Sequence, residues 1–575
     1  MGQHGGLDCP SFAARSGKGL GARALPGTTT QAGTAQAFRN FGSGDPPPAA
    51  EIHRRPEEPQ AAQALIGKLI RRMQEPHRYA DEGKAHADPS DNGRIPAGYT
   101  YFAQLAGHDI VHGAMTAVSL ADGTQPRVNL RSRPLVLDTV YGRGPTDDPI
   151  SYEMPEAHGE GREKLRLGHI RMTEPNRPNA ACPVHTARDV PRARIEGLSD
   201  TANEGAADTL LTDPRNDDSV NLSQLTTLFL MFHNAVIDIL RARNPFPDDV
   251  STATEFLSFS RFSLARQITA AVYRGIVVKD LLPRLIRPEI WKLYNQARPR
   301  PLADTPDGRM PVEFCDAAYR LGHAMVRQSY RMSRQTETFG IRDVIETSSA
   351  RRARETPIRD IWVVEWSRFF SIDGSRPQLS RRIGPGYNAV MLYDTLFRNA
   401  YVGNGDGALD PTMSGLLYRD LVRGSTCGLR TVNSLAELLP GAVLDQSRLL
   451  ADRGHRTAAL RAWLDAGDTV TFEPGERDAL AADPPLMFYL LFEAAQEEDG
   501  KSFGTLASVI AADVFAGALE QSRDLIEEAR DPIAGLTTAE AVAHVFGRHV
   551  PETMSQLIVF IAKALKLESV EPLFI

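Results

Sequence analysis

Cysteine is scarce in this sequence, and the few cysteines stand far apart. Only four occur, at Cys9, Cys182, Cys315 and Cys427, and none belongs to a CxxC pair. Structural zinc sites and dense disulfide frameworks need more closely spaced cysteines. The sequence therefore argues against both, and we expect four buried or free thiols.

Long basic runs and long apolar segments are missing as well. The net charge is −7, and no run of lysine and arginine is long enough to follow a phosphate backbone, so no nucleic-acid partner is expected. The N-terminus lacks the apolar core of a secretory signal. The longest apolar run, from Leu225, is too short and too often interrupted to span a bilayer. We predict a protein without a transmembrane segment, cytoplasmic or released without a classical signal peptide; the oligomeric state is left open.

Helical patterns are abundant, whereas the alternation typical of strands is rare. Residues 1–85 are expected to form an irregular N-terminal extension with one helix from Pro59 onward, because the first 50 residues are rich in Gly, Ala, Pro and Thr. Residues 86–575 are expected to form one helical domain. Apolar residues recur at i, i+3, i+4 and i+7 over residues 222–241, 255–273, 312–326, 485–497, 506–522 and 539–546. The predicted fold is mainly α, with a large single core and few short strands.

The segment YTYFAQLAGHDIV, residues 99–111, places Gln104 and His108 one helical turn apart within an apolar, aromatic run. At this spacing both side chains leave the same helix face. A base and an amide donor aimed at one point in a dry pocket suit a small polar ligand such as peroxide. A histidine in an apolar helix is more often a hydrogen-bonded core residue, so this pair needs support from elsewhere in the chain.

A second segment is a polar loop around Arg215 that runs into a long apolar helix, which Ser219 or Asn221 could cap. On its own, Arg215 is more commonly part of an ion pair at the surface or within the capping loop. His233 and Asn234 lie deep in the apolar helix, where a buried polar pair that ties helices together is the preferred interpretation.

A third segment, residues 311–332, carries an apolar stripe and places Gly322 beside His323. A small residue next to a histidine on a buried face leaves room for a flat cofactor. Alone, this segment is only suggestive.

Together the three segments resemble the animal-type haem peroxidases of the peroxidase–cyclooxygenase superfamily, in their bacterial form. The Gln-x-x-x-His of that family's distal helix is matched by Gln104 and His108. Its catalytic arginine stands eighteen residues before the histidine of a His-Asn pair, as Arg215 does before His233. Its proximal iron ligand ends a Tyr/Phe-Arg-x-Gly-His run, matched by residues 319–323.

Further segments extend the resemblance from about residue 95 to about residue 530, in the family's order. Residues 418–429 resemble the segment whose Asn orients the proximal histidine and whose Arg pairs with a haem propionate; Asp420 and Arg423 hold these positions. Residues 366–374, and the segment from Pro484, resemble core segments of the family.

The resemblance implies a haem-dependent peroxidase that reduces hydrogen peroxide through an oxo-ferryl intermediate and oxidises an organic or halide donor, with a role in the response to oxidative stress. His323 would bind the iron of a haem b. His108 would act as general base and then acid with a near-neutral pKa, Arg215 would stabilise the departing hydroxide, and Gln104 would order the peroxide. The alternatives are a haem-binding or pseudoenzyme scaffold without turnover, and a haem-dependent oxygenase or halogenase of a specific metabolite.

Several positions depart from the family pattern. Of the two carboxylates that form ester bonds to haem in some members, one is replaced by Gly107 and the other is Asp218, one methylene shorter than the usual Glu. We therefore expect non-covalent haem held by His323 and packing, with a single ester through Asp218 as the alternative. The family's calcium site would use Asp109 and Asp138, but Val136 stands where an Asp is usual.

Two departures lie near His323. The family's neutral amide has become Asp420, which would push electron density toward the iron if it accepts a hydrogen bond from the His323 ring. The radical-forming Tyr of cyclooxygenase-type relatives, three residues before the proximal histidine, is Arg320 here. This disfavours a fatty-acid oxygenase that uses that Tyr, and Tyr319 is expected to project at a different helical angle.

Overall fold

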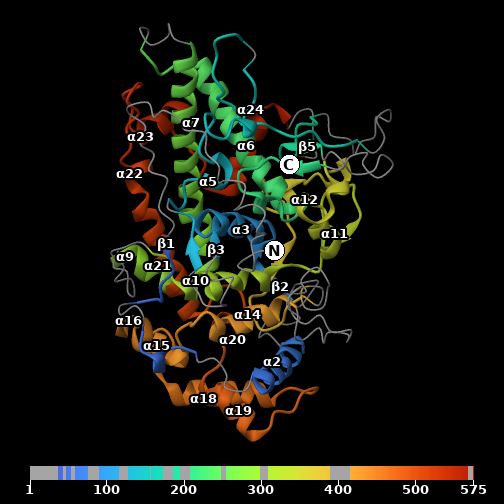
Figure 1. Ribbon diagram of the computed structural model, residues 1–575, viewed down its shortest axis with the longest axis vertical. Helices are drawn as coiled ribbons and strands as arrows, with labels where there is room; N and C mark the ends of the chain where they lie inside the picture. The colour runs from blue at the N-terminus through green and yellow to red at the C-terminus, as the bar shows by residue number, and fades with distance from the viewer. Residues whose placement is uncertain are drawn as a thin grey trace.

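The computed structural model of the chain describes residues 36–42, 47–53, 59–75, 90–115, 127–131, 133–155, 157–172, 185–194, 207–247, 254–297, 309–388, 391, 415–567 and 574–575. Within these ranges the protein is mainly α, as predicted, and its strands are short (Figure 1). Nearly all of its buried apolar side chains belong to one continuous cluster, so the predicted single core is present in the described part of the chain.

Helix α6 (Val220–Ala242) lies in the centre of this core. It packs against α3 (Gly98–Ile110), α7 (Thr254–Ile276), α23 (Thr538–Phe546) and α24 (Met554–Ala564). Its N-terminus is capped by Ser219, whose side chain accepts a hydrogen bond from the Leu222 N–H. Among the described helices, α6 alone is long and apolar enough to cross a membrane. Its apolar segment is 78% buried against other helices, which is typical of a core helix.

The helices predicted from periodicity occur within a few residues of their expected bounds. They are α2 (Pro59–Gln74), α6, α7, α20 (Leu486–Glu498), α21 (Thr505–Gln521) and α23. The remaining longer helices are α9 (Pro288–Ala297), α14 (Leu416–Thr426), α18 (Arg453–Asp465) and α19 (Pro474–Ala482). Short helices are α5 (Asp138–Tyr141), α8 (Leu282–Leu285), α11 (Ile341–Glu346), α12 (Ser349–Arg352), α15 (Val432–Glu437), α16 (Gly441–Leu444), α17 (Arg448–Ala451) and α22 (Arg523–Ile526). A π-helical turn, η5 (Val277–Leu281), joins α7 to α8.

The strands form small antiparallel sheets at the surface of the helical core. A three-stranded sheet has the order β1 (Gln36–Ala37), β4 (Arg127–Asn129), β3 (Gly113–Met115). Three two-stranded pairs join β2 (Asp91–Pro96) to β9 (Leu379–Arg381), β5 (Arg192–Arg194) to β6 (Ala207–Thr209), and β7 (Ser329–Arg331) to β8 (Thr338–Gly340). The register Gln36↔Asn129 and Ala37↔Val128 places the start of the described chain beside the segment that follows α3.

The prediction of one helical stretch over residues 312–326 is wrong. Helix α10 (Val312–Asp316) ends at Ala317, whose φ of −137° and ψ of −75° are not helical, and a 3₁₀ helix, η6 (Ala318–Met325), follows. Side chains three residues apart are eclipsed in a 3₁₀ helix, whereas an α-helix offsets them. Arg320 and His323 therefore leave η6 on the same side.

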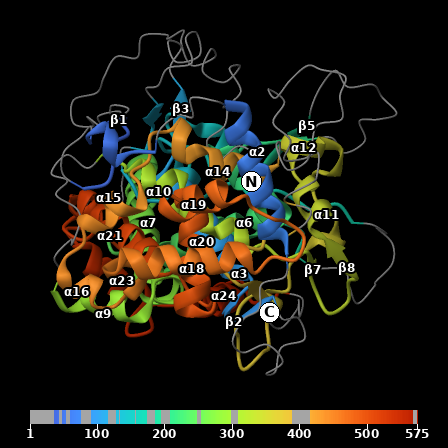
Figure 2. The same ribbon diagram turned by 90° about the horizontal axis from the view of Figure 1, so that it is seen from below.

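The helix of the N-terminal extension is attached to the C-terminal part of the chain. Helix α2 packs against α14, and the Lys68 ammonium pairs with Glu476 of α19 at 2.6 Å. The Arg72 guanidinium lies 4.1 Å from the centre of the Trp463 ring of α18. Figure 2 shows α2 beside α14 and near α19. The division at residue 85 remains a prediction.

Candidate active site

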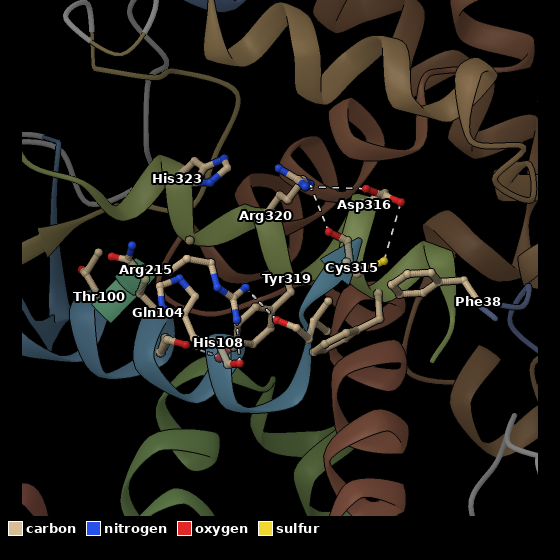
Figure 3. A pocket seen from close by; sticks show the side chains of 16 residues that line it. Phe38, Thr100, Gln104, His108, Arg215, Cys315, Asp316, Tyr319, Arg320 and His323 are labelled. Carbon is tan, nitrogen blue, oxygen red and sulfur yellow. Dashed lines mark hydrogen bonds and ion pairs between the residues drawn. The ribbon is translucent and has the colours of Figure 1, made fainter. Parts of the chain in front are cut away.

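A pocket between α3 and η6 brings together four of the residues predicted from the sequence. Gln104, His108, Arg215 and His323 all line it, with the two histidines on opposite walls (Figure 3). The empty space of the pocket, counted with its open mouth, is about 800 Å³.

His108 is buried on the third turn of α3 and is held by an amide. Its Nδ1 lies 2.9 Å from Oδ1 of Asn216. Because that oxygen can only accept, Nδ1 carries the hydrogen and Nε2 carries the lone pair. Burial, assisted by the nearby charge of Arg215, lowers the pKa of His108 to about 3. The near-neutral pKa expected from the sequence is therefore wrong, and the ring is neutral at physiological pH.

Arg215 lies on the 3₁₀ turn η3 (Pro214–Asp217) and is fixed against the C-terminal end of α3. Its guanidinium donates to both carboxylate oxygens of Asp213, at 3.0 and 2.7 Å. It also donates to the carbonyl oxygens of Val111 at 2.8 Å and His108 at 3.1 Å. Arg215 is thus a buried residue that reaches the pocket and pairs with Asp213 of its own capping loop. Of the two ion pairs expected for the isolated residue, the one within the capping loop forms and the one at the surface does not.

Two residues of this cluster were not identified from the sequence. Arg131 donates to the His108 carbonyl at 3.1 Å and also pairs with Asp213. Burial alone would raise the pKa of Asp213, but Arg215 and Arg131 hold it well below its usual value. The only sequence signal was the Asp-Pro before Arg215, since Asp213 caps η3 by accepting from the Arg215 N–H. Nothing in the sequence linked Arg131 to this loop.

On the opposite wall, η6 presents His323 with its Nδ1 2.7 Å from Oδ2 of Asp420 on α14. Asp420 also accepts from Arg320 at 3.3 Å and from the Tyr387 hydroxyl at 3.3 Å. Burial lowers the pKa of His323, although Asp420 opposes the shift. The result is a neutral imidazole whose Nδ1–H is held by a carboxylate.

This arrangement fits a haem. A histidine whose Nδ1–H is held by a carboxylate presents Nε2 as its metal-binding nitrogen, and the neutral ring is the form that binds a metal. A Cβ added to Gly322 would meet nothing within 4 Å, so the space beside His323 is open. His323 would bind the iron, and Asp420 would orient the ring.

Tyr319 lies in the pocket, which the sequence did not reveal. Its hydroxyl donates to the Ala103 carbonyl of α3, and its ring packs 4.8 Å from that of Phe314. A Cβ added to Gly107 would lie 2.3 Å from Cε1 of Tyr319. The absence of a side chain at position 107 therefore lets Tyr319 connect the two walls.

One predicted haem contact is not brought to the pocket, and the side chain of another lies outside the described structure. Asp218 is buried but is not among the residues that line the pocket. Arg423 lies on α14, but its side chain is outside the described part of the structure. The roles of both residues remain predictions.

The residues of the expected calcium site do not fit a calcium ion. The Asp109 carboxylate accepts from the N–H groups of Leu137 at 2.8 Å and Thr139 at 3.4 Å. Burial raises the pKa of Asp109 to about 7. Asp138 pairs with Arg266 at 2.8 Å and Arg133 at 3.3 Å. Calcium needs six or more oxygen ligands, and no cluster of three metal-ligating side chains occurs among the described residues.

His233 and Asn234 form a buried, hydrogen-bonded polar pair, as predicted. His233 contacts the Tyr141 hydroxyl at 3.0 Å and the Glu163 carbonyl at 2.8 Å. The Asn234 side chain accepts from the Leu165 N–H and donates to the Leu165 carbonyl, both at 2.8 Å. They are a buried polar pair that holds the 163–165 segment on α6.

Comparison with known proteins points to one family. The family model for animal haem peroxidase matches residues 159–363. No curated protein matches the chain. Among solved structures, peroxidase A from Dictyostelium discoideum is 13% identical with a TM-score of 0.47, covering 90% of this chain and 92% of that one. A variant of Oryza sativa fatty acid alpha-dioxygenase with palmitic acid is 12% identical with a TM-score of 0.50, covering 92% and 83%. This second likeness supports the fold.

Proposed function

We propose that the pocket between α3 and η6 binds haem b without a covalent bond, because the family model for animal haem peroxidase matches residues 159–363. We further propose that the protein reduces hydrogen peroxide and oxidises a small organic or halide donor. The observation that carries this proposal is that His108, Arg215 and Gln104 share one pocket with His323. The haem, when bound at His323, would supply the redox chemistry.

On the α3 side, His108 supplies the base. The Asn216 oxygen holds the Nδ1–H at 2.9 Å, so Nε2 is the nitrogen that accepts a proton from peroxide. A base with a pKa of about 3 gives the proton back readily, which suits delivery to the departing oxygen. Arg215 keeps its charge beside this site and stabilises the negative charge that develops, while Gln104 hydrogen-bonds the peroxide.

On the η6 side, Asp420 supplies a negative charge behind His323. Its contacts with Arg320 and Tyr387 hold the carboxylate in place. The hydrogen bond to Nδ1 increases the electron density of the imidazole and so its strength as a ligand. The chain itself thus fixes the orientation and charge of the metal ligand.

Arg320 argues against a fatty-acid oxygenase that depends on a tyrosine three residues before His323. Its guanidinium pairs with Asp420 at 3.3 Å and lies 3.6 Å from Asp316. The position is committed to an ion-pair network that a tyrosine could not form. A peroxidase is therefore the function that this site supports best.

Haem loading and peroxide turnover test the proposal. The purified protein is expected to take up haem with a strong Soret band and to oxidise at least one donor from a panel of guaiacol, iodide and bromide when peroxide is added. His323→Ala should lose most of the bound haem, whereas His549→Ala, which removes an exposed histidine, should retain it. Failure to bind haem would overturn the proposal. Haem binding without oxidation of any donor would favour a scaffold without turnover.

A further inference from the structure

Residues 36–42, here called the strap, lie beside the pocket and connect the segments that flank its two walls. On the side of α3, β1 pairs with β4, the neighbour of β3. On the side of η6, the Arg39 N–H donates to the Met310 carbonyl at 3.1 Å, and the Arg39 carbonyl accepts from the Val312 N–H at 2.8 Å. The strap therefore joins the segment after α3 to the segment before η6.

A buried carboxylate fixes the strap at its far end. Glu313 of α10 is fully buried and accepts from the Asn40 side chain at 2.7 Å and from the Phe41 N–H at 2.8 Å. The Asn40 side chain also donates to the Gly428 carbonyl at 2.8 Å. The strap thus contacts Glu313, the residue that precedes Phe314 in the sequence, and Phe314 lines the pocket.

Phe38 is the strap residue that reaches the pocket. It lines the same cavity as His108 and His323, and Figure 3 shows its ring pointing toward Cys315 at the end away from Gln104. A Cβ added to Gly113 would lie 3.7 Å from the tip of this ring, so the ring tip points toward β3. The side chain is only partly buried. A molecule that enters at this end would contact the Phe38 ring.

The charges of the pocket favour a neutral molecule at this end. Arg320 is paired with both Asp420 and Asp316, so the η6 side of this end carries two carboxylates for one guanidinium and offers little attraction for an anion. Arg215, which shares Asp213 with Arg131, keeps its positive charge on the other wall, beside His108. Phe38, Phe314 and Cys315 add apolar surface.

We propose that the strap forms the donor-binding wall of the pocket and that Phe38 selects a neutral, planar aromatic donor, such as a phenol, over a halide. The proposal rests on the proposed function, because it names the donor of that reaction. An aromatic ring offers offset-stacked or edge contacts to a flat donor, whereas a halide gains nothing from it.

The test compares donors in the haem-loaded, full-length protein. Phe38→Ala should lower kcat/KM for phenol about ten-fold, the size expected for loss of one aromatic contact, and should leave kcat/KM for iodide within about two-fold. Phe256→Ala, which removes an exposed phenylalanine of α7 outside the pocket, is the matched control and should change neither value. Asn40→Ala changes a residue outside the pocket and removes one of the two hydrogen bonds between the strap and Glu313. It should lower the phenol value selectively and by a smaller factor.

Binding gives a second readout that needs no turnover. Phenol added to the resting haem protein should perturb the Soret band, and Phe38→Ala should raise its Kd while leaving the Kd for cyanide unchanged. If phenol and iodide oxidation are both unchanged, or both fall equally, in Phe38→Ala, the strap has no part in donor selection and the inference is overturned. If the wild-type protein binds haem but oxidises no donor, the proposed function fails, whereas the Kd for phenol in Phe38→Ala still tests the inference; an unchanged Kd would overturn it.

Discussion

Asp420 is the residue that brings a negative charge to His323. It is nearly completely buried, yet it accepts hydrogen bonds from His323, Arg320 and Tyr387. A neutral amide could still accept from the imidazole, but it would bring no charge. The exchange between carboxylate and amide therefore isolates the electrostatic contribution of the residue.

We expect Asp420→Asn to retain haem, to raise the ferric/ferrous potential, and to slow the reaction with peroxide by about 10–100-fold, the usual cost of losing a partner of a metal ligand. The reason is that less electron density reaches the metal through His323. Spectroelectrochemistry and stopped-flow absorbance measure the two effects. Asp343→Asn, at an exposed position of α11, is the control. A potential that stays equal or drops in Asp420→Asn would contradict the expectation.

The pKa of His108 predicts an unusual pH profile. Because burial lowers this pKa to about 3, the ring stays neutral as the pH falls from 8 to 5, and the rate of reaction with peroxide should be flat over that range. Protonation near pH 3 should then abolish the reaction, since a protonated imidazole cannot accept a proton. Pre-steady-state rates across pH 3–8 test this expectation, and a midpoint near 6.5 would refute it.

At the scale of elements, the contact between α3 and η6 depends on one glycine. Tyr319 donates to Ala103, and its ring occupies the space where a side chain at position 107 would begin. The centre of this ring also lies 5.8 Å from that of Phe515 on α21. Moving the Tyr319 ring would therefore lose this packing contact.

Gly107→Ala should therefore destabilise the protein by about 1–3 kcal/mol, the usual cost of overpacking a core. Gly275→Ala on α7 is the matched control, because its Cβ would meet nothing within 4 Å; it should be neutral or stabilising by up to about 1 kcal/mol. Urea denaturation measures both. Combining Gly107→Ala with Tyr319→Ala should cost less than the sum of the single changes, and strict additivity would show that the two positions do not interact.

Helices could be predicted from the sequence where apolar residues recur at helical spacing over a long segment. Helices α6, α7, α20 and α21 follow such periods, and their bounds were anticipated within a few residues. The break at Ala317 and the 3₁₀ form of η6 were not, because they depend on contacts between distant parts of the chain. Arg320 reaches Asp420, one hundred residues later, and no local pattern encodes that contact.

The site was predictable to a similar extent. Gln104, His108, Arg215 and His323 were found by spacing and resemblance, and the structure places all four around one pocket. The sequence did not identify Arg131, Asp213 and Phe38. Each depends on a contact whose partner either lies far away in the sequence or belongs to no recognisable motif.

At the scale of the whole molecule, buried histidines link stability to pH. Burial lowers the pKa of His233 to about 4, against about 6.5 in the unfolded chain. Between these values the unfolded chain binds the extra proton, so the stability that the neutral ring provides is complete above pH 6.5 and is lost as the pH falls toward 4. Asp109, with its raised pKa, acts with the opposite sign, so the contribution of His233 must be measured by difference.

His233→Gln should be less stable than the wild type at pH 7, but its free energy of unfolding should fall by about 2 kcal/mol less between pH 7 and pH 5. Urea denaturation at the two pH values gives both quantities. The exposed His549→Gln should show the same pH dependence as the wild type. An identical loss in His233→Gln and the wild type would show that this histidine is not linked to unfolding.

The strap has a consequence for how the protein is made. Asn40 bonds to Gly428, and the Arg430 guanidinium donates to the Phe41 carbonyl, across separations of 388 and 389 residues. During synthesis, residues 36–42 are made long before residues 428 and 430, so they can form these contacts only after the chain has grown past residue 430. The side of the pocket that Phe38 lines can therefore be completed only after about three quarters of the chain has been synthesised.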